Sequence, residues 1–210
     1  MKAAALFSGG KDSLYAMYLA EKQGISVDHL ITLLPTLPWP SPHAENIESL
    51  KILAKSMNKN HIIIDFKEEN SFIETLKKLE IDALVAGDIN VEAHLTGLKD
   101  VCNKTNLELL EPIYGKNTSD LFHKIFGLGF KAMITGVNLE YLKEEWLGFV
   151  ISQQTGSSFL SNIGTTDPLG ENGEFHTLVL ECPLYNRKFR VQAIKKKSTE
   201  DMVYLNVKLN

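Results

Sequence analysis

The run SGGKDS, residues 8–13, holds the residue types best suited to chemistry in the first part of the chain. Its two glycines let the backbone approach an oxyanion without a Cβ in the way, its serine hydroxyls donate hydrogen bonds, and its lysine adds a full positive charge. The run lies between an apolar segment and an amphipathic one. A loop that opens a helix also presents backbone N–H groups and the positive end of the helix dipole. The sequence therefore predicts a phosphate-binding loop.

The loop differs from the two most familiar phosphate-binding patterns. No glycine stands five residues before Gly10, and Asp12 follows the lysine where a Walker loop needs Ser or Thr. The spacing does not match GxGxxG either. The alternative interpretation is a glycine turn that ends in an ordinary helix N-cap.

The elements that must hold this loop follow from the hydrophobic pattern. Short apolar runs typical of strands occupy residues 2–7, 27–34, 61–66, 81–89 and 130–137. Amphipathic runs of helical period alternate with them, at 12–23, 43–58, 70–79, 91–105 and 117–128. This order predicts the α/β class, with a Rossmann-like parallel sheet and flanking helices.

After about residue 138 the pattern changes to loops, followed by β-like runs at 177–182, 187–195 and 202–209. We therefore expect two domains. Residues 1–115 form the nucleotide-binding domain, and residues 116–210 form a smaller C-terminal α+β lobe that supplies part of the acceptor-substrate site.

Composition narrows the class of partner. The 210 residues carry a formal net charge of -4, which argues against nucleic acid as the main partner. Cys102 and Cys182 are too few and too far apart for a disulfide scaffold, which favours a reducing compartment. No apolar run approaches membrane length. We expect a cytoplasmic protein that acts away from membranes on a small or protein-borne substrate.

A second group of candidate residues lies in the stretch GENGEFH, residues 170–176. Glu171 and Glu174 stand three residues apart in a glycine-containing turn, and His176 follows. Residue type alone favours solvated turn carboxylates. A carboxylate pair can also orient ammonium, accept its proton or bind a metal, with the histidine as an orienting partner. The spacing does not decide between these roles.

Asp88 stands at the carboxyl end of a predicted parallel strand, the edge where α/β folds bind ligands. A role in nucleotide or metal binding is the favoured interpretation. The alternative is an N-cap for the helix that starts near Val91.

The loop after a hydrophobic strand resembles the PP-loop of the N-type ATP pyrophosphatases, which cleave ATP between the α and β phosphates. The resemblance implies that the pyrophosphate part of ATP is held by Ser8, Gly9, Gly10, Lys11, Asp12 and Ser13, and that Asp12 helps to hold Mg²⁺. In-line attack at the α-phosphate then gives an adenylated substrate, with the electrostatic load on the lysine, the metal and the backbone amides.

Three further stretches narrow the resemblance: AGDI (86–89), EPIYGKNTSDL (111–121) and DPLGENGEFHTLVL (167–180). With the loop, they make the whole chain similar to the diphthine–ammonia ligase family, especially its bacterial-type branch. The resemblance implies a ligase that adenylates a carboxylate and transfers ammonia to it, releasing AMP and pyrophosphate. It implies catalytic roles for Lys11, Asp12, Glu171, Glu174 and His176, and Asp88 at the nucleotide.

The implied partners are ATP, ammonium and a carboxylate acceptor. The family's acceptor is diphthine, a modified histidine on translation elongation factor 2, but bacteria lack the diphthamide pathway, so a small-molecule acceptor is the alternative. The sequence also departs from the family pattern: the motif usually written EPLWGR has Lys116 at its last position here, and the motif WLGR ends in Phe149. Lysine keeps the charge but lacks the bidentate geometry of arginine.

Two other functions share such a loop. A tRNA-thiolating enzyme requires catalytic cysteines and a basic RNA surface, which the two cysteines and the acidic balance do not provide. An ATP-binding module without turnover is distinguished from a ligase only by analysis of products. The sequence does not indicate an oligomeric state.

Overall fold

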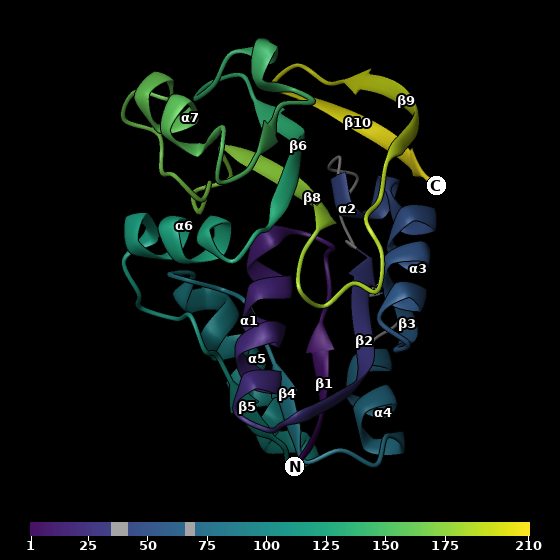
Figure 1. Ribbon diagram of the computed structural model, residues 1–210. Coiled ribbons are helices and arrows are strands. Elements are labelled where there is room, and N and C mark those ends of the chain that lie inside the picture. The colour runs from purple at the N-terminus through teal and green to yellow at the C-terminus, as the bar shows by residue number, and fades with distance from the viewer. Residues whose placement is uncertain (35–41, 66–69) are drawn as a thin grey trace. The chain divides into compact units, whose positions relative to one another are not determined.

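The computed structural model describes residues 1–34, 42–65 and 70–210, and these residues form two compact units (Figure 1). The first unit holds residues 1–8, 12–34, 58–65 and 70–115. The second holds residues 9–11, 42–57 and 116–210. The middle of the glycine loop therefore groups with the second unit, although the strand before it belongs to the first.

The sheet of the first unit has five parallel strands in the order β3-β2-β1-β4-β5. Their bounds are Lys2–Leu6 (β1), Ser26–Leu34 (β2), Asn60–Asp65 (β3), Ala83–Val85 (β4) and Glu108–Leu110 (β5). The helices of this unit are α1 (Lys11–Lys22), α4 (Ser71–Lys78) and α5 (Glu92–Thr105). The predicted α/β class with a Rossmann-like parallel sheet is confirmed.

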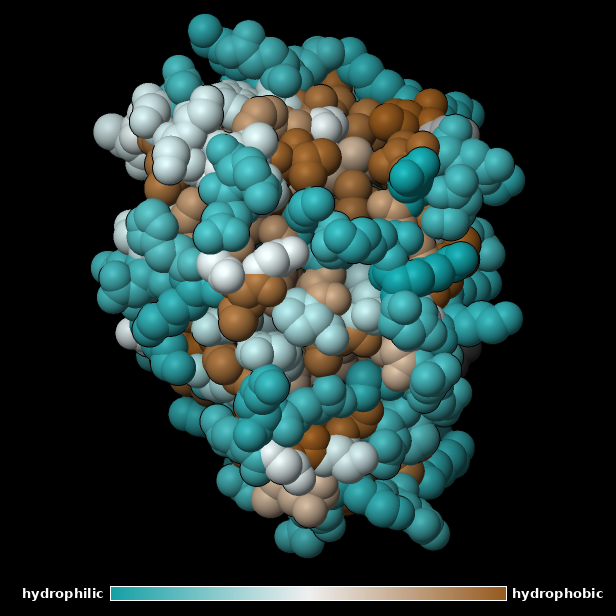
Figure 2. Space-filling model, in the orientation of Figure 1, coloured by the Kyte–Doolittle hydropathy of each residue, from teal (hydrophilic) through white to brown (hydrophobic). Residues whose placement is uncertain are grey.

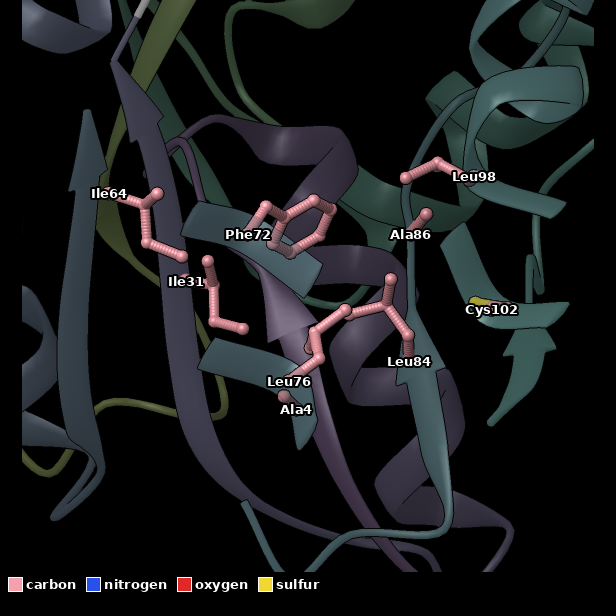
Figure 3. Close-up of a cluster of buried hydrophobic side chains, with 9 residues drawn as sticks. All are labelled: Ala4, Ile31, Ile64, Phe72, Leu76, Leu84, Ala86, Leu98 and Cys102. Atoms are coloured by element: carbon pink, nitrogen blue, oxygen red, sulfur yellow. The ribbon is translucent and has the colours of Figure 1, made fainter. Parts of the chain in front are cut away.

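One face of this sheet is covered by α4 and α5 (Figure 3). Phe72 and Leu76 stand four residues apart on α4, so both side chains point to the same side of the helix, where they join Ala4 and Leu84 of the sheet. Cys102 reaches the same cluster from α5. The small side chains of β1 let these helices pack close to the strand that leads into the glycine loop.

The second unit is built on an antiparallel sheet. Its central strand, β6 (Lys131–Asn138), pairs with β7 (Val150–Ile151), β8 (Phe175–Glu181) and β10 (Met202–Leu209). β9 (Val191–Ser198) pairs with β10. The helices are α2 (Pro42–Glu45), α3 (Ile47–Ser56), α6 (Thr118–Gly127) and α7 (Gly156–Asn162), with a 3-10 turn at Glu144–Trp146.

The assignment of residues 130–137 to the parallel sheet was wrong. They form β6, which is antiparallel to every strand that it pairs with. Its interior is buried throughout, so the apolar run has the continuous pattern expected of a parallel strand. The missing strand of the first sheet is β5, whose three residues are too few to show a period.

Two buried polar residues explain how α3 docks on β10. β6 pairs with β10 only as far as Tyr204. Beyond it, the Asn46 side chain donates to Leu205 O (2.9 Å) and accepts from Val207 N (2.7 Å), and Ser49 Oγ donates to Val207 O (2.5 Å). The helix thus satisfies strand groups that would otherwise be buried without partners.

The face drawn in Figure 2 is mostly hydrophilic, with hydrophobic residues in scattered groups. Over the described parts of the chain, every helix is too short or too polar to cross a membrane.

Candidate active site

The glycine loop lies between β1 and α1, as the sequence predicts. Gly9 has a φ of +71°, the left-handed region that favours glycine. A Cβ at this position would also meet Leu50 Cδ2 at 2.4 Å and Leu178 Cδ1 at 3.1 Å. Both the backbone angle and the packing within the second unit therefore require glycine at position 9.

Hydrogen bonds fix the ends of the loop within the first unit. The Ser8 N–H donates to Ser13 Oγ (3.4 Å), and the two serine hydroxyls lie 3.1 Å apart. Where β1 ends, Thr32 Oγ1 donates to Phe7 O (2.6 Å) and contacts His61 Nε2 (2.8 Å). These bonds hold both predicted serines at the carboxyl end of β1.

The strand order reverses beside β1. The chain proceeds from β1 to β2 and β3 on one side, then crosses to β4 and β5 on the other. Ligands of open α/β sheets bind outside the carboxyl ends of the strands at such a reversal. Gly87, just after β4, packs against the first turn of α1: a Cβ on it would lie 2.9 Å from Asp12 O. The turn that carries Asp88 therefore abuts the start of α1.

Asp88 does not cap a helix. The N-cap position of α5 is occupied by Val91, and Asp88 Oδ1 lies 2.9 Å from His94 Nδ1. At the end of the next strand, the Glu111 Oε1 atom is buried without a hydrogen-bond partner in the described parts of the chain. Burial raises the pKa of Glu111, the charge of Asp88 raises it further, and Lys99 opposes both.

Glu111 was not singled out from the sequence. The available signal was its place directly after the apolar pair Leu109–Leu110, the position that a carboxyl-end residue of a short strand would take. That signal could be used only if residues 108–110 were first recognised as a strand, and three residues are too few for that.

Within the second unit, Lys11 lies against β8 and the turn before it. Its N–H donates to Thr177 Oγ1 (3.2 Å), and Val179 N donates to Gly9 O (2.9 Å). Its Nζ donates to Leu169 O (2.5 Å) and lies 5.0 Å from the centre of the Phe175 ring. Lys11 is only 2% exposed. The adjoining Gly10 is also buried.

The two carboxylates of the GENGE turn have different environments. Glu174 is 3% exposed and accepts from the Asn172 N–H (2.8 Å), the Asn172 side-chain amide (2.9 Å) and the Asp167 N–H (3.3 Å). The Glu174 carboxylate therefore holds together the turn to which it belongs. Glu171 is half-buried in the same turn. This arrangement gives Glu174 a positioning role and makes Glu171 the better candidate for contact with a substrate.

His176 is a neutral imidazole near pH 7. Burial lowers its pKa to about 3, with smaller contributions from His43 and Lys11. The His43 and His176 rings meet edge to face, 5.3 Å apart. Gly136 stands opposite His176 in β6, and a Cβ there would lie 3.3 Å from the imidazole Cδ2. The histidine can therefore orient a neighbour through a hydrogen bond, but it does not supply a positive charge.

Comparison with known proteins decides the family. A model of the diphthamide synthase N-terminal domain matches residues 1–109, and a model of the diphthamide synthase C-terminal domain matches residues 117–210. The chain belongs to the diphthamide synthase family. The resemblance inferred from the glycine loop and the GENGE turn is thereby confirmed.

Several relatives are named diphthine–ammonia ligase, among them proteins from yeast, human and mouse. The one from Schizosaccharomyces pombe is 24% identical over 99% of this chain, which spans only 39% of that relative's length. The human and mouse proteins are each 26% identical over 92% of this chain and 84% of their own length. A solved structure described as a predicted subunit of tRNA methyltransferase from Methanocaldococcus jannaschii aligns with a TM-score of 0.45, at 20% identity, over 64% of this chain and 80% of that one.

One departure from the expected family motif has a visible structural effect. Phe149, where an arginine was expected, contacts the Trp146 ring edge to face at 5.0 Å and stacks on Phe159 at 6.1 Å. Phe159 in turn meets Phe175, over which the Lys11 ammonium lies. An aromatic cluster therefore stands where the expected motif has an arginine. The other departure, Lys116, is exposed.

Proposed function

We propose that this chain is an ATP-dependent ligase that adenylates a carboxylate and transfers ammonia to it, releasing AMP and pyrophosphate. The observation that carries the proposal is the glycine loop between β1 and α1, at the edge where the strand order of a parallel sheet reverses. The names of the relatives support an acceptor carboxylate of the diphthine type.

The loop residues fit a polyphosphate. The left-handed Gly9 turns the backbone ahead of a helix N-terminus, and the hydroxyls of Ser8 and Ser13 lie together at 3.1 Å. Lys11 brings the positive charge. These groups suit the β- and γ-phosphates, which leave together as pyrophosphate.

The carboxylates of Asp12 and Asp88 suit Mg²⁺ that arrives with the nucleotide. Mg²⁺ is held by one or two carboxylates and substrate phosphates, with water filling its remaining positions. Within the described ranges, no group of three or more His, Cys, Asp or Glu side chains is arranged to hold a metal. When bound, Mg²⁺ would neutralise charge that develops on the phosphates.

The protein groups would divide the reaction. The glycine loop binds and orients the leaving phosphates, while Lys11 stabilises their charge. Glu171 accepts a proton from ammonium, so that ammonia can attack the activated acyl carbon. Glu174 holds the turn in shape, and the neutral His176 orients a neighbouring donor or acceptor.

The aromatic cluster around Phe149 favours a second candidate within the same reaction class: amide formation on a small-molecule acceptor that presents no anion at this position. The tRNA-thiolation alternative loses support, because burial raises the pKa of Cys102 to about 11 and that of Cys182 to about 12. Thiols with such pKa values are poor nucleophiles near pH 7.

Calorimetry with ATP and Mg²⁺ tests the nucleotide assignment. The double variant Lys11→Ala with Asp12→Ala should lose most of its ATP affinity, whereas Lys22→Ala, at the exposed end of the same helix, should bind like the wild type. If the double variant binds ATP with unchanged affinity, the phosphate-loop assignment is wrong.

A further inference from the structure

The turn before β8, residues 167–174, is braced by its own hydrogen bonds. Leu169 N donates to Asp167 Oδ1 (2.8 Å), Gly170 N donates to Asp167 O (3.0 Å), and Thr118 Oγ1 of α6 donates to Asp167 Oδ2 (2.7 Å). Gly170 has a φ of +72°, and a Cβ there would lie 2.8 Å from Phe175 O. The turn has a defined shape, and it carries Glu171.

Besides Thr118, the ammonium of Lys11 braces the turn from outside. Its bond to Leu169 O is short, at 2.5 Å, and Phe175 lies 5.0 Å from the same nitrogen. A charged donor in a buried setting makes a stronger hydrogen bond than a neutral one. The lysine predicted to meet phosphate thus holds the turn predicted to meet the acceptor.

Both roles draw on one ammonium. The Leu169 carbonyl is a neutral acceptor, whereas a polyphosphate offers a cation a full negative charge at each phosphate. A polyphosphate at the glycine loop therefore attracts Lys11 more strongly than the Leu169 carbonyl does.

We propose that Lys11 is a positioning residue that clamps the turn of residues 167–174 in the ligand-free protein, and that a polyphosphate at the glycine loop draws its ammonium away and loosens the turn. The inference rests on the proposed function for its second half. Binding of a polyphosphate at the glycine loop would then change the mobility of the turn that carries Glu171.

Hydrogen exchange followed by mass spectrometry on the full chain measures the effect. The probe is inorganic pyrophosphate, with its binding measured separately by calorimetry. Saturating pyrophosphate should speed exchange of the amides of Leu169, Gly170 and Gly173 by roughly tenfold or more, the scale for loss of one charge-assisted bond. Bound pyrophosphate that leaves these amides unchanged, or slows them, overturns the release.

Variants test the clamp without ligand. Lys11→Met keeps the apolar stem but removes the ammonium, and should show the fast exchange of the turn before any pyrophosphate is added. Lys22→Met is the matched control, because Lys22 lies over the Tyr18 ring (5.4 Å) on the same helix. It should match the wild type, including its response to pyrophosphate. A Lys11→Met protein whose turn exchanges like the wild type overturns the clamp.

The two proposals fail in different ways. If pyrophosphate does not bind the wild type, both the proposed function and the release are overturned, and the ligand-free comparison still decides whether Lys11 holds the turn. If Lys11→Met does not fold, the wild-type experiment with pyrophosphate decides the release. In that case Lys11→Arg, which keeps a cation, takes the place of Lys11→Met. Without ligand, the amides of its turn should exchange as slowly as those of the wild type.

Discussion

Gly87 packs directly against Ser13: a methyl group on Gly87 would lie 2.9 Å from the Ser13 Cα. The atoms that such a methyl group would meet belong to the backbone of Asp12 and Ser13, and backbone atoms cannot rotate away as the end of a side chain can. The turn after β4 and the first turn of α1 are therefore held at a distance that only glycine allows.

Gly87→Ala should separate these two turns. We expect a loss of about 1–3 kcal/mol in the free energy of unfolding, the usual scale for overpacking, and a weaker affinity for ATP. Urea unfolding and calorimetry measure the two effects. Gly97→Ala in α5 is the control, since nothing lies within 4 Å of its Cβ position. It should gain about 0.5–1 kcal/mol, because alanine favours a helix interior. Equal stabilities for the two variants would disprove the contact.

The two carboxylates of the GENGE turn should respond differently to the same chemical change. Glu174→Gln places an amide where three N–H groups donate to a carboxylate, so it should lower the free energy of unfolding by about 1–3 kcal/mol. Glu171→Gln should leave stability within about 0.5 kcal/mol while amide formation falls roughly 10²–10⁴-fold. Thermal melts and single-turnover assays on both variants decide this. A Glu171→Gln enzyme with normal turnover removes Glu171 from the chemistry.

Much of the fold follows from hydrophobic period. The run predicted at 202–209 is β10, and the helix predicted at 70–79 is α4, Ser71–Lys78. Period does not report the direction of a strand's partner, so β6 was placed in the wrong sheet. It also fails for elements as short as β5 and β7. Strand direction depends on long-range pairing, which local sequence does not encode.

The candidate site was predictable in composition but not in arrangement. Residue type singled out Lys11 as a phosphate ligand, whereas the roles expected of Glu171 and Glu174 came from the family resemblance, because residue type alone favours solvated turn carboxylates. Spacing did not reveal that Glu174 turns inward to close its own turn, or that Lys11 bonds Leu169 O. The Lys11 contact depends on how β8 and the turn before it lie beside the glycine loop within the second unit, which is a tertiary property, whereas the Glu174 contacts depend on the exact conformation of its own turn.

The products of the reaction distinguish a ligase from a nucleotide-binding module. With ammonium and the right acceptor, AMP and pyrophosphate should appear in equal amounts, because the loop holds the phosphates that leave together. Chromatography of the nucleotides, with a pyrophosphate assay, measures both. Direct formation of ADP and orthophosphate would exclude adenylation. The Lys11→Ala, Asp12→Ala double variant serves as the control and should form neither product.

The half-buried His176 should make folding stability depend on acid. Its pKa is about 3 in the folded chain and near 6.5 when unfolded, so the unfolded state binds more protons between these values. Stability therefore falls as the pH drops below 6.5, and this one group accounts for about 2 kcal/mol by pH 5. His176→Gln cannot titrate and should lose less stability between pH 7.5 and pH 5 than the wild type. Urea unfolding at the two pH values measures the difference. His123→Gln, at an exposed position of α6, should keep the wild-type loss. If the wild type and His176→Gln lose equal stability, His176 is not held neutral by its burial.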